Sequence, residues 1–394
     1  MSSQTTAQIS EAAREPVPSI AGVPAAPIVR PPPRAIGVGP VGWVRRNLFS
    51  SWVNTAITLV LGCLLVWWAI RLFSWGILNA VWTVPAKGNG VDASACSAAH
   101  GVGACWAVVS ENARLILFGR YPYDEQWRPA IAVLLFLGLY AVSAMRRFWR
   151  RELVLIWLVT LTAIGVLMWG GVLGMPYVSE DSWGGLPITL ILATFGLAFA
   201  FPLAIFVALG RRAQNLPAVR WLCVVFVEVI RGVPLVTLLF MASVMFPLFM
   251  PQGFNPNALL RAQVAIILFV AAYVAEVIRG GLQALPKGQY EAADALGLSY
   301  WKKTGLIILP QALRLVIPPL VNTFIGFFKD TSLVLIIGIF DLLSTGKLVL
   351  AAPDWRAYST EIYLVLGLVY FVFCYVMARY SRGLEREFGR SVRR

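Results

Sequence analysis

The sequence predicts an all-α, multi-pass membrane protein with about eight transmembrane helices. Of its 394 residues, 59% are hydrophobic and only 13% are charged, and the mean hydropathy is +0.74. A soluble domain carries roughly 25% charged residues, so this chain lacks the polar groups needed to cover its own surface in water. The composition therefore excludes a cytosolic enzyme, a disordered chain and a nucleic-acid-binding protein, although the net charge is +14.

Apolar stretches long enough to cross a bilayer define the individual helices. A bilayer core about 30 Å thick needs roughly 20 apolar residues in a helix. Uninterrupted apolar runs favour helices, because the strands of a membrane barrel would alternate in polarity. We expect the second span to extend as far as Trp149. The eight expected spans cover residues 52–83, 130–145, 153–174, 186–209, 221–246, 259–283, 315–340 and 361–379.

The two ends of the chain differ in kind from the spans. The N-terminal region holds eight prolines between Pro16 and Pro40, and no apolar run long enough for a signal peptide. We expect residues 1–50 to form a disordered, Pro-rich cytoplasmic tail. Residues 386–394 are expected to form a basic cytoplasmic tail.

Lys and Arg are distributed unevenly between alternate loops. With the N-terminus inside, the cytoplasmic segments carry 22 of them and the outer segments carry six. By the positive-inside rule, this asymmetry predicts that both termini lie in the cytoplasm. Two groups of arginines are interpreted as topology anchors rather than ligand sites: Arg146, Arg147, Arg150 and Arg151, and Arg211 with Arg212.

The longest outer loop, residues 85–128, contains Cys96, Cys105 and the only histidine, His100. In an oxidising compartment the two cysteines could close a small disulfide loop, and the sequence leaves the bonded and the free forms open. A metal site is disfavoured, because no fourth ligand accompanies these three residues. The remaining cysteines lie in apolar helices, where we expect them to pack: Cys63, Cys223 and Cys374.

A distinctive motif lies in the longest cytoplasmic loop, residues 284–314, between the sixth and seventh spans. The pattern indicates a short helix, a break at Gly297, a second helix capped by Ser299, and Pro310 closing the unit. Such a compact knob suits a groove on a soluble partner, although an ordinary amphipathic loop would obey the same helix physics. The motif residues are Glu291, Ala292, Ala293, Gly297, Ile307, Leu309 and Pro310.

These residues, at this spacing, resemble the EAA loop of ABC importer permeases, and we call residues 284–314 the EAA loop. Four segments resemble the polar amino acid (His/Glu/Gln/Arg/opine) branch of that family: Glu276–Gly281, Pro286–Tyr290, Leu309–Arg314 and Lys329–Leu333. Two outer-loop segments make the whole chain resemble the M-type permease subunit of the general L-amino-acid transporter: Phe118–Pro122 and Trp127–Pro129.

The resemblance implies a domain organisation. It implies a type I (MetI-like) ABC importer transmembrane core over residues 186–385 that contains the EAA loop. Three additional helices, with the periplasmic loop 85–128, would precede this core in residues 51–185. The chain would then be a permease of the bacterial inner membrane that moves polar L-amino acids from periplasm to cytoplasm by alternating access.

The resemblance also implies partners. A second homologous permease subunit is expected to form a heterodimer with this chain, two ABC ATPase subunits would bind the EAA loops, and a periplasmic amino-acid-binding protein would deliver the L-amino-acid substrate. Membrane lipid surrounds such a protein, and no nucleic acid is expected. The energy for transport would come from ATP and Mg²⁺ used by the partner ATPase.

The chain itself lacks the residues for catalysis. Gly346 and Lys347 are followed by Leu348, and Asp341 stands where the first glycine of a phosphate-binding loop would be. A single histidine in an outer loop leaves no Ser-His-Asp or Cys-His arrangement. We therefore expect no enzymatic activity and no cofactor bound by this chain.

Four charged residues inside the spans form a repeated pattern. Glu228 and Arg231 lie in the pentapeptide Glu-Val-Ile-Arg-Gly, which Glu276 and Arg279 repeat 48 residues later. Three-residue spacing places each Glu and Arg on one helical face, where they can pair. Two interpretations stay open. The residues could form an inner gate or a contact near the ATPase docking site, or they could be pairs that neutralise themselves so that the helix can enter lipid.

Four further residues near the middle of the seventh span form a candidate substrate path: Lys329, Asp330, Thr331 and Ser332. A zwitterionic amino acid carries a carboxylate and an ammonium group, which a cation and an anion beside hydroxyls would complement. An ion pair between Lys329 and Asp330 is the competing interpretation, although adjacent residues point about 100° apart on a helix. We expect Pro318–Pro319 to kink or break this span.

The alternative function is an ion- or proton-coupled secondary amino-acid carrier. Such carriers contain repeated halves with broken helices, and the pentapeptide repeat is the one feature here that agrees. This alternative gives the EAA loop no role. Dependence of uptake on ATP rather than on a proton gradient separates the two functions.

Overall fold

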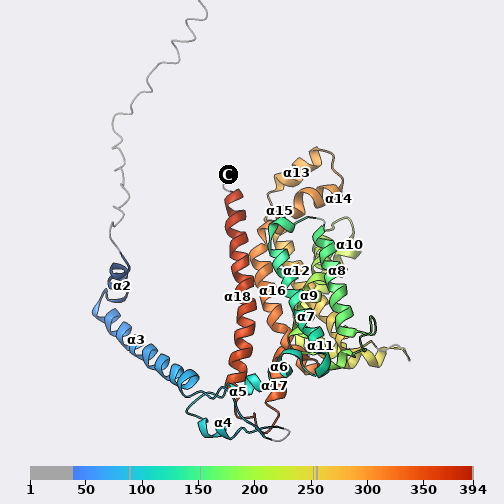
Figure 1. Ribbon diagram of the computed structural model, residues 1–394. Helices are drawn as coiled ribbons and strands as arrows, with labels where there is room; N and C mark the ends of the chain where they lie inside the picture. Colours follow the sequence, from blue (N-terminus) through green and yellow to red (C-terminus); the bar gives the residue numbers. More distant parts are fainter. Residues whose placement is uncertain (1–38, 88–89, 151, 252, 254–255, 393–394) are drawn as a thin grey trace, which may run out of the picture. The chain divides into compact units, whose positions relative to one another are not determined.

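The computed structural model describes residues 39–87, 90–150, 152–251, 253 and 256–392 (Figure 1). The chain divides into two compact units with a boundary after Leu72. In the first unit, helix α2 spans Pro40–Leu48 and α3 spans Trp52–Phe73. The predicted disordered tail lies outside the described residues as far as residue 38. The prediction of disorder is wrong at residues 40–48, which form helix α2.

The second unit contains the remaining elements. Its α-helices are α4 Ser94–Ala99, α5 Ala107–Glu111, α6 Ala113–Phe118, α7 Trp127–Ala144, α8 Glu152–Trp169, α9 Gly185–Gly210, α10 Pro217–Gly232, α11 Leu235–Phe240, α12 Ala258–Ala284, α13 Lys287–Ala295, α14 Tyr300–Lys303, α15 Leu309–Leu315, α16 Ile317–Asp330, α17 Leu342–Val349 and α18 Ser359–Val392. The π- and 3₁₀-helices are η2 Ser74–Leu78, η3 Tyr123–Glu125, η4 Arg146–Phe148, η5 Glu180–Ser182, η6 Met241–Met245, η7 Phe246–Phe249, η8 Thr304–Ile308 and η9 Thr331–Ile337. The strands are β1 Ala86–Lys87, antiparallel to β2 Gly90–Val91, and β3 Phe340–Asp341.

Seven helical segments among the described residues are long and apolar enough to cross a membrane, or eight if one bent pair is a single span. The bent pair is the fifth predicted span: α10 and the helical segment 235–249 are inclined by 104°. Val233 between them has an extended backbone, with φ −108° and ψ 133°. Pro234 causes this break, because it lacks an N–H group and disfavours the helical conformation in the residue before it.

Other span boundaries also differ from prediction, and the first span ends at Leu78 rather than at residue 83. The second span ends at Ala144 rather than Trp149, and it begins earlier, at Tyr123. The third span ends at Trp169, where Gly170 and Gly171 adopt positive φ angles of 68° and 76° and turn the chain. Pro318–Pro319 lie in the first turn of α16, so these prolines begin that helix and do not kink it.

Helices α9 and α12 pack against each other at the centre of the second unit. Gly196 of α9 allows a close approach, because a Cβ atom there would lie 2.9 Å from Cγ2 of Ile266 in α12. The same continuous core includes Phe136 of α7 and Met168 of α8. The domain boundary expected between residues 185 and 186 therefore does not coincide with a break in packing.

The opposite ends of the second unit carry different structures (Figure 1). Helices α13 and α14 lie beyond one end of the bundle, and α5, α6 and α17 lie at the other. We call the end with α5, α6 and α17 the outer end, because the distribution of Lys and Arg predicts that it faces away from the cytoplasm.

Three segments meet at the outer end through glycines. A Cβ atom at Gly119 would lie 2.5 Å from the Cα atom of Gly184, and a Cβ atom at Gly185 would lie 2.1 Å from the carbonyl oxygen of Leu117. Both Gly119 and Gly185 also have positive φ angles, 63° and 69°. Gly184 in turn forms a β-bridge with Phe340. Glycine is required here because a side chain would separate these segments.

The outer loop folds onto the beginning of α18. Cys96 and Cys105 are joined by a disulfide, with 5.4 Å between their Cα atoms. The backbone N–H of Cys105 donates a 3.0 Å hydrogen bond to the buried carboxylate of Glu361. The ring of His100 packs edge-on against Tyr358, 5.9 Å away. No group of three or more His, Cys, Asp and Glu side chains within the described residues is placed to hold a metal ion.

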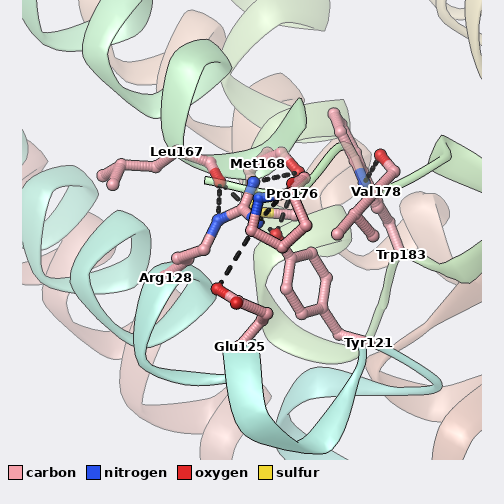
Figure 2. A network of polar contacts seen from close by, with 8 residues as sticks. All are labelled: Tyr121, Glu125, Arg128, Leu167, Met168, Pro176, Val178 and Trp183. Carbon is pink, nitrogen blue, oxygen red and sulfur yellow. Dashed lines mark hydrogen bonds and ion pairs between the residues drawn. The ribbon is translucent and has the colours of Figure 1, made fainter. Parts of the chain in front are cut away.

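A fully buried arginine holds the end of α8 (Figure 2). The guanidinium of Arg128 donates from Nε to the carbonyl of Leu167 at 2.6 Å, and from Nη1 to that of Pro176 at 3.0 Å. Its Nη2 donates to the carbonyl of Met168 at 3.4 Å, and its Nη1 lies 3.6 Å from Glu125 Oε2. The last carbonyls of a helix have no partner within the helix, so this side chain replaces the water that they would otherwise require.

Tyr121 supports the same helix end. Its hydroxyl donates to the carbonyl of Met168 at 3.0 Å (Figure 2). Burial raises the pKa of Tyr121 to about 12, so the hydroxyl keeps its proton at neutral pH and remains a donor. Arg128 and Tyr121 together fix the loop 170–184 that follows α8.

We predict that Arg128→Met lowers the thermal midpoint of the purified protein by several degrees, because each buried carbonyl left without a donor costs about 1–3 kcal/mol. Thermal unfolding in detergent, followed by tryptophan fluorescence, measures this. Arg356→Met is the matched control, since Arg356 is an exposed arginine of another outer segment. An unchanged midpoint in Arg128→Met would mean that the guanidinium is dispensable.

Candidate coupling loop and translocation path

The EAA loop contains two helices separated by a turn at Gly297. The N–H of Gly297 donates to the carbonyl of Asp294 at 2.9 Å, and the N–H of Leu298 donates to that of Ala293 at 3.3 Å. These two bonds form a Schellman motif, which places the residue after the helix cap in the left-handed region. Gly297 accordingly has a φ of 67°, and no atom lies within 4 Å of the position of a Cβ. Backbone conformation, rather than lack of space, therefore requires glycine here.

The second helix of the loop differs from prediction. Ser299 occupies its N-cap position, but its side chain makes no capping hydrogen bond. An ion pair of 2.5 Å between Lys303 Nζ and Asp294 Oδ1 joins the two helices instead. Pro310 does not close the unit, since the helical run continues from Tyr300 through the π-helical turn η8 to Leu315. A wide π turn provides an alternative hydrogen-bonding pattern next to a residue without an N–H group.

The motif residues divide between surface and core. Glu291, Ala292 and Pro310 are exposed, and Ala293 is buried. Ile307 and Leu309 are half-buried and pack against the main core. Large apolar side chains of the loop are exposed although they lie outside the spans: Leu296 at 75%, Tyr300 at 50%, Trp301 at 67% and Leu306 at 72%. An apolar surface of this kind typically marks a contact with another protein.

Arg211, at the end of α9, forms ion pairs with a glutamate of α10 and a glutamate of α12. Its Nη1 lies 2.7 Å from Glu276 Oε2 and its Nη2 lies 2.9 Å from Glu228 Oε1. Glu276 also pairs with Arg279, as the three-residue spacing predicts. The predicted pair Glu228–Arg231 is wrong, because Glu228 binds Arg211, while the guanidinium of Arg231 lies 5.2 Å from the centre of the ring of Tyr273.

Arg212 connects the same helix end to the EAA loop. Its Nη1 donates to the carbonyl of Leu282 at 2.9 Å and to the hydroxyl of Tyr290 at 2.7 Å. That hydroxyl donates to the carbonyl of Leu282 at 2.8 Å. The interpretation of Arg211 and Arg212 as topology anchors missed these contacts. The available signal was their position, two cations directly after an apolar span.

The candidate path residues lie where α16 changes into η9. The hydroxyl of buried Thr331 donates to the carbonyl of Phe328, and that of Ser332 donates to the carbonyl of Lys329, both at 2.9 Å. Lys329 is exposed and Asp330 is half-buried. Within the part of the chain that the structure describes, these two form no ion pair with each other. The charged groups of Lys329 and Asp330 are therefore not paired with each other, whereas the hydroxyl hydrogens of Thr331 and Ser332 are already bonded to backbone carbonyls.

Comparison with known proteins identifies relatives along most of the chain. The sequence profile of the family described as "Binding-protein-dependent transport system inner membrane component" matches residues 200–390. The "Inner membrane amino-acid ABC transporter permease protein YhdY" of Escherichia coli (strain K12) is 49% identical over 354 residues, 88% of this chain and 92% of that protein. A solved "amino acid ABC transporter with histidines" is 30% identical over 52% of this chain and 92% of that one, with a TM-score of 0.46.

A second relative extends across the same region. The "Glutamate/glutamine/aspartate/asparagine transport system permease protein BztC" of Rhodobacter capsulatus is 36% identical over an alignment of 424 residues that covers 90% of this chain and 95% of that protein. These findings confirm the predicted family and the predicted all-α, type I importer fold. This chain is therefore a multi-pass inner-membrane protein that belongs to the binding-protein-dependent transport components, among the permeases of amino-acid ABC transporters.

Proposed function

We propose that this chain is the permease subunit of an ATP-driven importer that moves polar L-amino acids from periplasm to cytoplasm. The observation that carries the proposal is the EAA loop, an exposed knob whose apolar side chains face solvent and whose base is hydrogen-bonded to the spans. The two relatives that align along most of this chain are amino-acid transport permeases, which supports this substrate class. The chain is a transport component rather than an enzyme.

The proposal includes partners and orientation. A second homologous permease would form a heterodimer with this chain, and two ABC ATPase subunits would bind the EAA loops and use ATP and Mg²⁺. A periplasmic binding protein would deliver the amino acid. Both termini and the EAA loop would lie in the cytoplasm, because 22 Lys and Arg occupy the segments on that side and six occupy the other. Residues 186–385 would form the importer core.

The contacts of Arg211 and Arg212, at the end of the second unit that carries α13 and α14, suggest how motion of the EAA loop reaches the spans. We call this end the inner end. When the ATPases move α13, the hydrogen bond from Arg212 to Tyr290 pulls on the end of α9. The neighbouring Arg211 then pulls on Glu228 of α10 and Glu276 of α12. Rigid helices joined at their ends can exchange two arrangements as units, which is the form of motion that alternating access requires.

We predict that Gly297→Val impairs coupling more than membrane insertion, because a β-branched residue in the left-handed region costs roughly 1–2 kcal/mol and would open the turn. The measurements are ATP-dependent amino-acid uptake and substrate-stimulated ATPase activity of the reconstituted transporter, with the membrane content of the chain as reference. Both activities should fall severalfold.

Gly297→Asn is the matched control, because Asn tolerates the left-handed conformation, and it should retain most of the activity. Normal substrate-stimulated ATPase activity in Gly297→Val would contradict the assigned role of the loop. Uptake by the wild type that follows a proton gradient and not ATP would overturn the proposed function and favour the secondary carrier.

A second prediction concerns the arginine that joins α9, α10 and α12. Arg211→Met should lower uptake about tenfold, since it removes the ion pairs that join the end of α9 to Glu228 of α10 and to Glu276 of α12. Glu228→Gln should add little in the Arg211→Met background, because the two residues act through one contact. Arg231→Met, on the same helix as Glu228, should retain most of the uptake. Equal losses in Arg231→Met and Arg211→Met would contradict this linkage.

We also propose that Lys329 and Asp330 contact the amino acid in the translocation path. Asp330→Asn and Lys329→Met should each reduce the rate of uptake about tenfold, because each removes a charge that complements the zwitterion. Initial-rate uptake at several substrate concentrations, normalised to the amount of transporter in the membrane, measures this. Unchanged kinetics in both variants would exclude the role.

A further inference from the structure

A cavity of about 240 Å³ lies at the outer end of the second unit, where α9 begins and where the chain leaves η9. Its charged lining comes from Arg120, Glu180 and Asp181, which precede the region that the family profile matches. Its apolar lining includes Leu259 and Phe340, which lie within that region. We call it the outer cavity. A space of this size accommodates a small metabolite rather than a protein segment.

Glycine contacts assemble the walls of the outer cavity. The close approach of Gly119 to Gly184 fixes the residue that follows, Arg120, beside the start of α9. The β-bridge from Gly184 to Phe340 holds the segment around Phe340 beside the start of α9 as well. The guanidinium of Arg120 accordingly lies over the ring of Phe340, 4.1 Å from its centre. The cation is thus oriented by an aromatic face.

The charge of Arg120 is not neutralised by the protein. Across the described residues its guanidinium makes the ring contact with Phe340 but no hydrogen bond or ion pair. Asp181, which also lines the outer cavity, likewise has no hydrogen bond or ion pair with any described residue. The outer cavity therefore presents a guanidinium, from Arg120, and a carboxylate, from Asp181, that have no hydrogen-bond or ion-pair partner among the described residues.

Glu180 is held in place beside Asp181. Asn257 and Trp169 donate side-chain hydrogen bonds to its carboxylate, the latter at 3.2 Å, and the hydroxyl of Tyr177 donates at 3.4 Å. Burial disfavours the ionised form, but the hydrogen bonds from its own backbone N–H and from these three side chains outweigh burial. They keep the pKa of Glu180 below its ordinary value, so the group is an anion at neutral pH.

We propose that the outer cavity binds the zwitterionic backbone of an α-amino acid, with Arg120 on the carboxylate and Asp181, beside Glu180, on the ammonium group. The inference rests on the proposed function and adds an entry site to it. A guanidinium forms paired hydrogen bonds with a carboxylate, and carboxylates accept from an ammonium. The mixed charges disfavour both a metal ion, which Arg120 repels, and a phosphate, which Asp181 and Glu180 repel.

The outer cavity is distinct from the candidate path. The seven residues of η9 separate Asp330 from Gly338, which lines the outer cavity. At a rise of about 2 Å per residue in a 3₁₀-helix, the eight steps from Asp330 to Gly338 correspond to roughly 16 Å. An amino acid in the outer cavity would thus be held at the outer ends of the spans, before it reaches Lys329 and Asp330.

The test is equilibrium binding of radiolabelled L-glutamine, and separately of L-glutamate, to the purified transporter complex containing the full chain, in lipid nanodiscs without the binding protein. Arg120→Met should raise Kd about 10- to 100-fold, the effect of losing charge-assisted hydrogen bonds. Asp181→Asn should raise it as well. Arg356→Met and Asp354→Asn are the matched controls, because both residues are exposed and outside the cavity lining, and their Kd should match the wild type.

Competition and uptake complete the test. N-acetyl-L-glutamine and L-glutamine α-amide each lack one backbone charge and should compete at least tenfold more weakly than L-glutamine. ATP-dependent uptake in cells is measured for every variant. Unchanged Kd in Arg120→Met and Asp181→Asn, or a wild type that takes up these amino acids with ATP yet binds neither, would overturn the outer site and leave the proposed function intact. A wild type without ATP-dependent uptake of either amino acid would overturn both.

Discussion

Guanidinium groups at the two ends of the helix bundle replace the water that helix ends and carboxylates would otherwise need. In hydrocarbon, each unsatisfied backbone group costs several kcal/mol, so every helix end near the bilayer requires a donor or an acceptor from the protein. At the outer end, Arg128 donates to the last carbonyls of α8. At the inner end, Arg211 and Arg212 serve two carboxylates, a carbonyl and a hydroxyl. The planar, multi-donor fork of arginine suits this task better than the point charge of lysine.

These contacts also determine which parts of the chain move together. The inner arginines join α9 to the helices on either side and to the EAA loop, so displacement of the loop is resisted by contacts to several helices rather than by one. At the outer end, the loop held by Arg128 carries Glu180 and Asp181. The positions of the charged groups in the outer cavity therefore depend on a buried arginine that does not line it.

The sequence was sufficient for the spans and the family, because apolar length and motif spacing are local properties. It was insufficient for the fifth span, since a long apolar run does not reveal that Pro234 bends the chain by 104°. The pairing of Glu228 failed for a related reason: the three-residue rule considers partners within one helix, whereas Arg211 lies 17 residues away on another. The outer cavity could not be predicted at all, because it forms where three segments distant in sequence meet through glycines.

The bond between Cys105 and Glu361 has a consequence for biogenesis. The two residues are 256 positions apart, and the hydroxyl of Thr345 reaches the carbonyl of Ile116 over 229 positions. The outer loop is synthesised early, but these acceptors and donors arrive only when the last helix crosses the membrane. The outer loop can therefore form these two contacts only when most of the chain has been translated. Its final structure forms late in membrane insertion.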